Sequence, residues 1–427
     1  MKTHHHTHPN LFRFLLRAFQ ILRRYGLSSK KMEAKLNQYI NILREHNIRP
    51  TFPITAEVLK RHPRIIEKYL NDGVEFAIHG YQHTDYSELS EEELSEHFNK
   101  SMDCFRKHNI IFSGFRFPYL KYNDKCMDVL GGFPFKWDSS HSIYWDVVDN
   151  EELKGMNLRN YQNMLNQYNY RSSSNHISLP RYRGNLLEIP VSLPDDDLLE
   201  RGGLENNGLL IDKWRRILEE THSRGELFTL QLHPERISVF KKALTSLIQR
   251  SRELDPKVWI PRLGDICKWW EEKRDFSVKL NKKSEGVFEV DVKCSPRATL
   301  LVRSHKAGNE DLLKGFSVVK GRKFVIKSPK YPIIGVPVGA PVELVNFLKN
   351  EGFIFELSEN REQFSVYLNN VRDFSVQDEM RTLDVIRDDT APLIRFWRWP
   401  AGYRSTLVVS GDIDGLSSLD FFVRLSS

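Results

Sequence analysis

Short apolar strands and amphipathic helices alternate along residues 29–275, and this alternation limits the fold more than any other feature. Strands are predicted where an apolar run lies between turn residues, at 50–56, 75–79, 114–119, 133–140, 186–192 and 226–235. Helices are predicted at 29–48, 57–71, 209–223, 236–252 and 262–273, and the capping box Ser90-Glu91-Glu92-Glu93 begins another. This order is typical of a largely parallel α/β sheet or barrel.

One further apolar strand comes from the other end of the chain. Residues 405–415 read Ser-Thr-Leu-Val-Val-Ser-Gly-Asp-Ile-Asp-Gly, a buried-strand pattern that ends in the acids Asp412 and Asp414. Such a strand needs a sheet to join, because an unpaired strand edge exposes backbone hydrogen-bonding groups.

The composition changes near residue 275. From there the chain consists of short apolar segments separated by turn residues, with one helix predicted at 342–350. This pattern predicts a β-rich accessory domain over residues 276–395.

The positive charge is concentrated at the amino terminus. The chain has 63 basic and 56 acidic residues, and residues 1–32 hold seven basic residues and no acidic one, so the remainder is balanced. No nucleic-acid-binding module is recognised, so we expect no nucleic-acid partner. The four cysteines lack CxxC spacing, which argues against a disulfide scaffold or a structural zinc cluster and fits a reducing cytoplasm.

Two N-terminal segments require separate treatment. Residues 1–10 are rich in histidine, which can bind metal adventitiously, and they are excluded from the fold argument. Residues 11–24 have apolar residues at helical spacing with arginines on the other side, but they are too short and too charged to span a bilayer. A helix packed on the domain core is favoured, and peripheral contact with an anionic membrane surface is the alternative.

The sharpest chemical signal is the segment His79-Gly80-Tyr81-Gln82-His83, just after a predicted strand. Two histidines at i and i+4 can both face one metal, and neutral imidazole is a preferred ligand of zinc and similar ions. Taken alone, this pattern is more typical of structural or solvent-exposed histidines.

Three further groups lie at the ends of predicted strands. Arg116 can orient a carboxylate, and His233 can serve as a general acid or base. Asp412 and Asp414, at i and i+2, can divide the roles of base and metal ligand. Each group alone has a structural explanation, but together with the two histidines they predict one metal-hydrolase site.

On these residues the sequence resembles the polysaccharide deacetylase family, carbohydrate esterase family 4. The matching segments, in family order within residues 50–275, are His79–His83, Arg116–Tyr119, Trp137–Ser140 and Leu232–Pro234. The resemblance implies an irregular (β/α)7-type barrel. It also implies a hydrolase of carbon–nitrogen, non-peptide bonds that removes N-acetyl or O-acetyl groups from glycans with a divalent metal.

The sequence departs from the family pattern in two ways. Gly80 stands where the family usually has Ser or Thr. The pattern His-Gly-Tyr-x-His is more similar to the branch that contains peptidoglycan deacetylases and cyclic-amide hydrolases such as allantoinase. The family's first strand, which ends in two aspartates, is found here at the C-terminus. This order suggests a circular permutation, in which residues 396–427 supply the first strand to a barrel formed mainly by residues 11–275.

The resemblance also implies roles for individual residues. Asp414, His79 and His83 would bind the metal, for which zinc is expected and Co²⁺, Mn²⁺ and Ni²⁺ are alternatives. The other implied roles are Asp412 as base, Arg116 as its partner, the backbone N–H of Tyr119 in the oxyanion hole, and His233 as the acid. Trp137, Trp145 and Tyr144 are each expected either to line the sugar site or to belong to the core.

The resemblance leaves the substrate open. An acetylated glycan or glycan precursor in the cytoplasm is expected, with residues 11–24 as the candidate contact to the inner membrane face. Two alternatives are a metal-dependent hydrolase of a non-glycan or cyclic amide, and a non-catalytic glycan-binding protein on the same fold.

Overall fold

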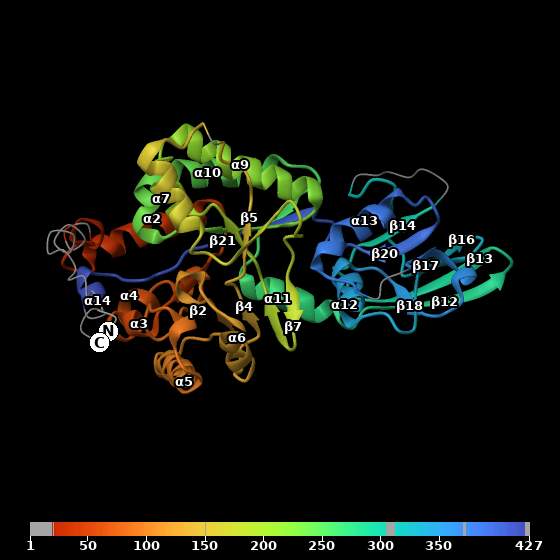
Figure 1. The fold of residues 1–427 in the computed structure, drawn as a ribbon, viewed down its shortest axis with the longest axis horizontal. Coiled ribbons are helices and arrows are strands. Elements are labelled where there is room, and N and C mark those ends of the chain that lie inside the picture. The colour runs from red at the N-terminus through yellow and green to blue at the C-terminus, as the bar shows by residue number, and fades with distance from the viewer. Residues whose placement is uncertain (1–18, 20, 150, 305–311, 370–372, 423–427) are drawn as a thin grey trace, which may run out of the picture.

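The computed structural model describes residues 19, 21–149, 151–304, 312–369 and 373–422. Among these residues the main sheet has nine strands in the order β10-β21-β1-β2-β3-β4-β8-β7, with β11 paired to β21 (Figure 1). The strands are β1 (Thr51–Ile54), β2 (Glu75–Ile78), β3 (Gly114–Phe115), β4 (Trp137–Asp138), β7 (Arg181–Arg183), β8 (Leu186–Glu188), β10 (Leu227–Gln231), β11 (Val258–Trp259) and β21 (Ser405–Ser410). Their pairings are parallel except for β7 with β8.

Helices lie on both sides of this sheet. Figure 1 shows α2, α7, α9 and α10 gathered along one side and α3, α4, α5 and α6 along the other. Their bounds are α2 (Lys30–Glu45), α3 (Ala56–Arg61), α4 (Pro63–Glu67), α5 (Glu91–Lys107), α6 (Asp124–Gly131), α7 (Gly155–Leu165), α9 (Asn207–Arg224) and α10 (Ile237–Glu253). Three others are α8 (Asp196–Arg201), α11 (Leu263–Lys273) and the C-terminal α14 (Ser418–Phe422). None of the helices within the described ranges is long and apolar enough to cross a membrane.

Local sequence signals explain where several helices begin and end. The predicted capping box of α5 is present, because Ser90 Oγ accepts from the Glu93 N–H and Glu93 accepts from the Ser90 N–H. The helix predicted over 57–71 is instead broken into α3 and α4. Pro63 is the first residue of α4, and a proline has no N–H to continue the hydrogen bonding of a preceding helix.

The C-terminal strand β21 lies inside the main sheet, between β10 and β1. It pairs in parallel with β10 from Leu227↔Thr406 to Gln231↔Ser410, and with β1 at Thr51↔Ser410. All six of its residues are buried. The prediction that this strand joins a sheet is therefore confirmed.

Among the described residues, the two end strands of the main sheet, β10 and β7, do not pair with each other, so the sheet does not close into a barrel. A second, three-stranded sheet contains β5 (Ser142–Tyr144), β6 (Tyr170–Ser172) and β9 (Val191–Leu193), and β9 approaches β10 through a hydrogen bond of 3.3 Å from the Thr229 N–H to Ser192 Oγ. We therefore describe the fold as mixed α/β, which confirms the predicted class but not a closed barrel.

The β-rich region lies beside the main sheet, at the right in Figure 1. Three small sheets form it, with strand orders β12-β13-β16, β15-β14-β20 and β18-β17-β19. Their strands are β12 (Ser277–Ser284), β13 (Val287–Lys293), β14 (Leu300–Arg303), β15 (Ser317–Val319), β16 (Lys323–Lys327), β17 (Tyr331–Val336), β18 (Phe355–Leu357), β19 (Phe364–Tyr367) and β20 (Leu393–Phe396). Two helices, α12 (Val342–Glu351) and α13 (Glu379–Asp388), accompany them. The domain boundaries at 275 and 395 stay predictions.

The predicted N-terminal helix can be compared with the structure only in part. Residues 11–18 and 20 lie outside the described residues, and residues 21–25 are helical. Phe19, one of the predicted apolar-face residues, is exposed.

The burial of β21 makes a prediction about stability. Leu407→Ala removes a fully buried side chain of β21, the strand between β10 and β1, and is expected to lower the free energy of unfolding by about 2–5 kcal/mol, measured by urea denaturation. Leu419→Ala makes the same change at a residue that is 59% exposed in α14, and it should alter stability by less than about 0.5 kcal/mol. Similar losses in both variants would contradict the central position of β21.

Candidate metal centre

The carboxyl ends of four parallel strands bring the predicted chemical residues to one edge of the main sheet. His79 directly follows β2, and Arg116 directly follows β3. His233 follows β10, and Asp412 and Asp414 follow β21. After β21 the chain stays beside β1, because the Ile413 N–H donates to the Pro53 carbonyl over 2.8 Å. This contact holds the two aspartates on either side of Ile413 at the same edge.

His79, His83 and Asp414 form a compact trio of side chains that could ligate a metal. Asp414 Oδ1 lies 3.5 Å from His79 Nε2, and Asp414 Oδ2 lies 3.3 Å from His83 Nε2. One ligand atom from each residue can be chosen so that all three lie within 4.8 Å of one another. Two ligand atoms at about 2.1 Å from one tetrahedral ion are about 3.4 Å apart, so the spacing fits a shared cation.

The hydrogen bond at the far side of His79 supports this fit. His79 Nδ1 lies 2.8 Å from the Arg116 carbonyl oxygen, which accepts hydrogen bonds only, so Nδ1 carries the proton and donates it there. Nε2 therefore presents its lone pair to the carboxylates of Asp414 and Asp412, at 3.5 and 3.6 Å. Nε2 is buried and has no hydrogen-bond partner among the described residues. Facing lone pairs of this kind are stabilised by a cation between them.

The backbone at Gly80 explains one departure from the family pattern. Its φ is +79°, in the left-handed region that glycine adopts without strain, and a Cβ at this position would collide with the Tyr86 hydroxyl group. That hydroxyl accepts a hydrogen bond of 2.7 Å from the Tyr81 N–H and so holds the loop between the two histidines. Ser or Thr at position 80 would displace this support.

Asp412 is held in place by two donors. Arg116 Nη1 donates to Asp412 Oδ1 over 2.7 Å, and both side chains are almost fully buried. Gln231 Nε2 donates to Asp412 Oδ2 over 3.0 Å. Arg116 is fixed in turn by Ser139, whose carbonyl and hydroxyl oxygens accept from Nε and Nη2. The expected position of Asp412 beside Arg116 is observed, and Gln231 is a partner that the sequence analysis missed.

His233 is oriented by a second carboxylate that the sequence analysis missed. Asp196 Oδ1 lies 2.7 Å from His233 Nδ1, and Asp196 Oδ2 accepts from the His233 N–H over 2.9 Å. Burial alone would lower the pKa of His233, but the Asp196 carboxylate outweighs it and holds this pKa well above its usual value. The available signal was the run Asp195-Asp196-Asp197, three consecutive acids shortly after a predicted apolar strand, and the structure shows that all three are buried.

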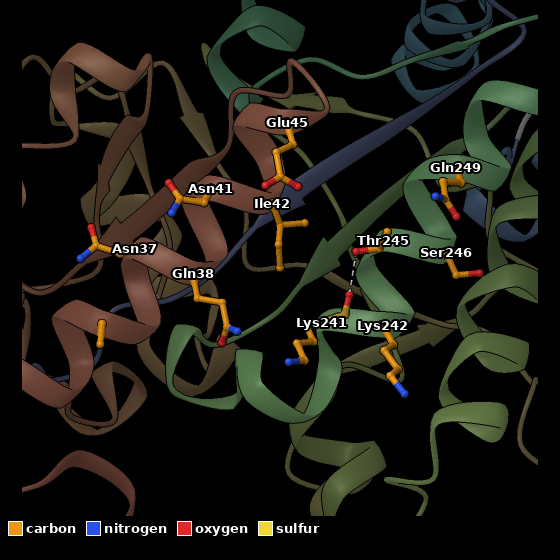
Figure 2. A pocket seen from close by; sticks show the side chains of 11 residues that line it. Asn37, Gln38, Asn41, Ile42, Glu45, Lys241, Lys242, Thr245, Ser246 and Gln249 are labelled. Atoms are coloured by element: carbon orange, nitrogen blue, oxygen red, sulfur yellow. Dashed lines mark hydrogen bonds between the residues drawn. The ribbon is translucent and has the colours of Figure 1, made fainter.

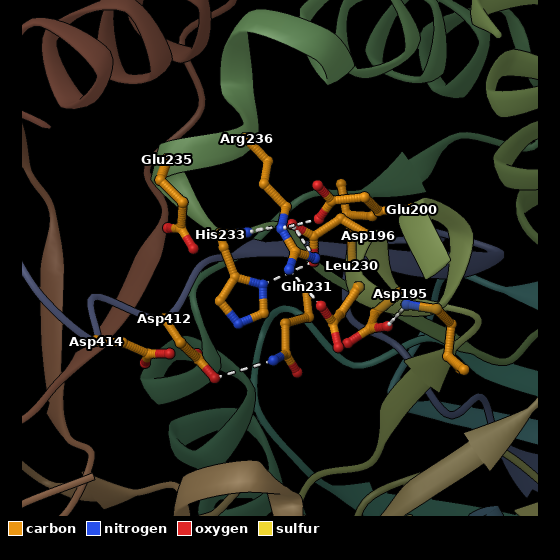
Figure 3. Close-up of polar contacts among 12 residues, drawn as sticks. Asp195, Asp196, Glu200, Leu230, Gln231, His233, Glu235, Arg236, Asp412 and Asp414 are labelled. Carbon is orange, nitrogen blue, oxygen red and sulfur yellow. Dashed lines mark hydrogen bonds and ion pairs between the residues drawn. The ribbon is translucent and has the colours of Figure 1, made fainter. Parts of the chain in front are cut away.

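A buried ion network supports Asp196 from behind (Figure 3). Arg236 pairs with Asp197, with Glu200 over 2.9 Å and with Asp196 over 3.6 Å. Although burial opposes its charge, these carboxylates hold the pKa of Arg236 well above its usual value. Glu235, the next residue along, accepts a hydrogen bond of 2.8 Å from the Tyr25 hydroxyl group. The N-terminal segment thus contacts the loop that carries His233.

The charge of Asp414 depends on its histidine neighbours. Burial would raise the pKa of its carboxyl group, but His83 and His79 outweigh burial and hold this pKa well below its usual value. This lowering arises because a positive charge beside the carboxyl group favours its ionised form, so the site favours a cation next to Asp414.

The aromatic candidates have different positions. Tyr119 is 47% exposed, and its ring packs edge-on against His83 with 4.2 Å between centroids. Its φ of +58° is unusual for a non-glycine residue and marks a tight turn after Arg116. Trp137 and Trp145 are fully buried, so of the two roles expected for them the core role is the one observed. Tyr144 is half-buried and packs against Tyr170.

A broad surface groove of about 760 Å³ lies elsewhere, between α2 and α10 (Figure 2). Asparagine, glutamine, lysine, serine and threonine side chains line most of it. Thr245 Oγ1, in this groove, donates to the Lys241 carbonyl group of its own helix. None of the predicted site residues lines this groove.

The trio makes a prediction about metal binding. Asp414→Ala should weaken Zn²⁺ binding by more than about 100-fold, because changes in outer-shell partners alone weaken it by about 10–100-fold. The affinity is measured by competition with a chelator, which also removes metal held by the histidine-rich residues 1–10. Asp275→Ala, at an exposed position, is the control and should bind like the parent protein. Equal affinities in the two variants would exclude Asp414 as a ligand.

The Asp196–His233 pair makes a prediction about protonation. Asp196→Asn removes the carboxylate that raises the pKa of His233, so burial dominates and the pKa should fall by at least about one unit. Histidine NMR titration measures this value. Asp197→Asn, whose carboxylate pairs with Arg236 and Arg201, should shift it less. An unchanged His233 pKa in Asp196→Asn would contradict the assignment.

Residues 26–136 match the family model of the polysaccharide deacetylases, and the search of curated protein sequences gave no match. A Mycobacterium smegmatis structure classed as a polysaccharide deacetylase is 20% identical and has a TM-score of 0.44, with 61% of this chain and 84% of that chain covered. A Pseudomonas aeruginosa PAO1 structure of the same class is 19% identical and has a TM-score of 0.46, with 59% and 76% covered. Puue allantoinase is 16% identical and has a TM-score of 0.46, with 62% and 78% covered.

The family match includes both histidines of the trio and the segment from Arg116 to Tyr119. Over residues 26–136 the chain is therefore similar to the polysaccharide deacetylase family.

Proposed function

We propose that this protein is a metal-dependent deacetylase that hydrolyses N-acetyl or O-acetyl groups of a polysaccharide or glycan precursor. The observation that carries the proposal is the placement of His79, His83 and Asp414 around one point, with Asp412 and Arg116 beside them. The similarity to the deacetylase family supports the substrate class.

His79, His83 and Asp414 would hold a divalent cation, for which zinc is proposed and Co²⁺, Mn²⁺ and Ni²⁺ are alternatives. A cation bound there supplies Lewis-acid chemistry, which polarises the acyl carbonyl group and lowers the pKa of a water molecule. Two imidazoles and one carboxylate are the ligand set of an open catalytic site.

Asp412 is proposed as the general base. Arg116 occupies its Oδ1, which leaves Oδ2 on the side of His79 to accept the proton of the attacking water. Gln231 donates to the same oxygen and fixes its direction. Because Arg116 and Gln231 already fix the orientation of the Asp412 carboxylate, little conformational entropy is lost when it accepts the proton.

His233 is proposed as the general acid. Asp196 accepts the Nδ1 proton, so Nε2 is the nitrogen that can give a proton to the leaving amine or alcohol. The raised pKa of His233 keeps the imidazole protonated near neutral pH, as this role requires. The backbone N–H of Tyr119 is proposed as a donor to the oxyanion, on the family resemblance.

The position of β21 supports a circular permutation of the family fold. We propose that residues 396–427 supply the first strand to a barrel formed by residues 11–275, and that the β-rich domain of residues 276–395 is inserted between them. The parallel pairing of β21 with β1 and β10 is the observation behind this proposal.

A hydrolase of a non-glycan or cyclic amide is the second candidate, because His79-Gly80-Tyr81-Gln82-His83 follows the pattern of that branch. A non-catalytic glycan-binding protein is less well supported, since binding alone needs no base or acid. A cytoplasmic location and contact of residues 11–24 with an anionic membrane stay proposals.

Acetate release tests the proposed reaction. Asp412→Asn should keep the metal and lower kcat at least about 100-fold on acetylated oligosaccharides, because a general base contributes about 10²–10⁴-fold. Asp275→Asn, at an exposed position, should retain full turnover. Near-normal turnover in Asp412→Asn would exclude it as the base. Hydrolysis of cyclic amides alone would favour the second candidate function. Glycan binding without acetate release would contradict the proposal that the protein is a deacetylase.

A further inference from the structure

A small pocket lies where the β-rich region meets the main sheet. Its volume is about 50 Å³, and five of the eleven residues that line it are basic. These are Arg224, Lys314, Arg387, Arg395 and Arg398. The pocket is separate from the metal centre, because none of the proposed site residues lines it.

Two of these arginines share one buried carboxylate. Arg398 Nη2 lies 2.7 Å from Glu351 Oε2, and Arg395 Nη2 lies 3.4 Å from the same oxygen. All three side chains are buried. Glu226, which is also buried, interacts with Arg398 as well. The residues that line the pocket nevertheless include five basic side chains and no acidic one, and buried positive charge favours an anion beside it.

A third buried arginine, Arg303, adds positive charge here, with Asp389 as a carboxylate that interacts with it. Arg303 donates from Nε and Nη1 to the carbonyl oxygens of Ala391 and Ile386, both over 2.8 Å, and these acceptors are neutral. Its Nη2 is buried and has no hydrogen-bond partner among the described residues. Its guanidinium lies 5.2 Å from the ring centre of Phe316, which lines the pocket, as Ile386 does.

The electrostatic environment of Arg395 agrees with this geometry. Burial lowers the pKa of Arg395 to about 10, and Arg398 and Arg303 contribute in the same direction although Glu351 opposes them. The guanidinium is held 4.0 Å from the ring centre of Phe353. It therefore cannot readily turn away from the pocket to reach solvent.

The size and the opening of the pocket limit what it can hold. A water molecule needs about 10–15 Å³ of such volume, so about 50 Å³ admits a group of a few heavy atoms. Lys314 and Arg387 are exposed at the pocket and can attract an anion from solvent, although Arg387 Nη1 also pairs with Asp384 over 2.9 Å. A planar guanidinium group can donate two parallel hydrogen bonds to two phosphate oxygens, whereas a monatomic anion offers only one acceptor atom.

We propose that this pocket binds a phosphate group, either as the free ion or as the head of a phosphate monoester. The group would accept hydrogen bonds from Arg395 and from the exposed pair Lys314 and Arg387. It would balance the buried arginines and so strengthen the junction between the β-rich region and the main sheet. This proposal is independent of the proposed deacetylase activity.

Isothermal titration of the metal-loaded protein with inorganic phosphate, at constant ionic strength, tests the proposal. The double variant Lys314→Ala with Arg387→Ala should bind phosphate at least about tenfold more weakly, because hydrogen bonds to charged groups are lost. The matched control is Lys320→Ala with Arg381→Ala. It removes two positive charges from exposed residues that do not line the pocket and should bind like the parent protein.

Glycerol phosphate forms the second arm and distinguishes the two sources of the group. Tighter binding of the monoester would support a phosphorylated metabolite, and tighter binding of inorganic phosphate would support the free ion. Equal phosphate affinity in the double variant and the parent protein would place the ion elsewhere, for example at the metal centre, and would overturn the proposal. Absence of binding in both arms would overturn it as well.

Discussion

The parallel pairing of β21 with β10 and β1 is the interaction on which the rest of the structure depends. It supplies backbone partners to both neighbouring strands, whose facing edges would otherwise be unpaired. It also carries Asp412 and Asp414 from the end of the chain to the two histidines that follow β2. One ladder of hydrogen bonds thus completes the sheet and assembles the candidate site, so fold stability and site geometry are coupled through the same strand.

Within the site, burial makes the balance of charge decisive. The charge of Asp412 is neutralised by Arg116, and that of Asp196 by His233 and Arg236. His79, His83 and Asp414, by contrast, bring three metal-ligating atoms within 4.8 Å of one another at largely buried positions. Asp412, which is paired with Arg116, is therefore suited to the proposed role of base. His79, His83 and Asp414 are suited to bind a metal.

The basic pocket at the junction follows the same physical rule with the sign reversed. There five basic side chains and no acidic one line the pocket, and Arg395 and Arg398 share the Glu351 carboxylate. Because the interior responds weakly to charge, an excess of either sign favours a counter-ion. The proposed metal and the proposed phosphate would therefore each balance a local excess of buried charge.

Local patterns in the sequence determined the α/β class, the capping box of α5, the apolar strand at 405–415 and the chemical candidates from His79 to Asp414. These features depend on side-chain periodicity and on residue chemistry, which neighbouring positions suffice to express. Only the tertiary structure decided that Gln231 and Asp196 would support Asp412 and His233, that Trp137 and Trp145 would be core residues, and that three arginines would meet near Glu351. Such contacts join residues far apart in the chain. Their geometry is set by how helices and strands pack, which no local pattern encodes.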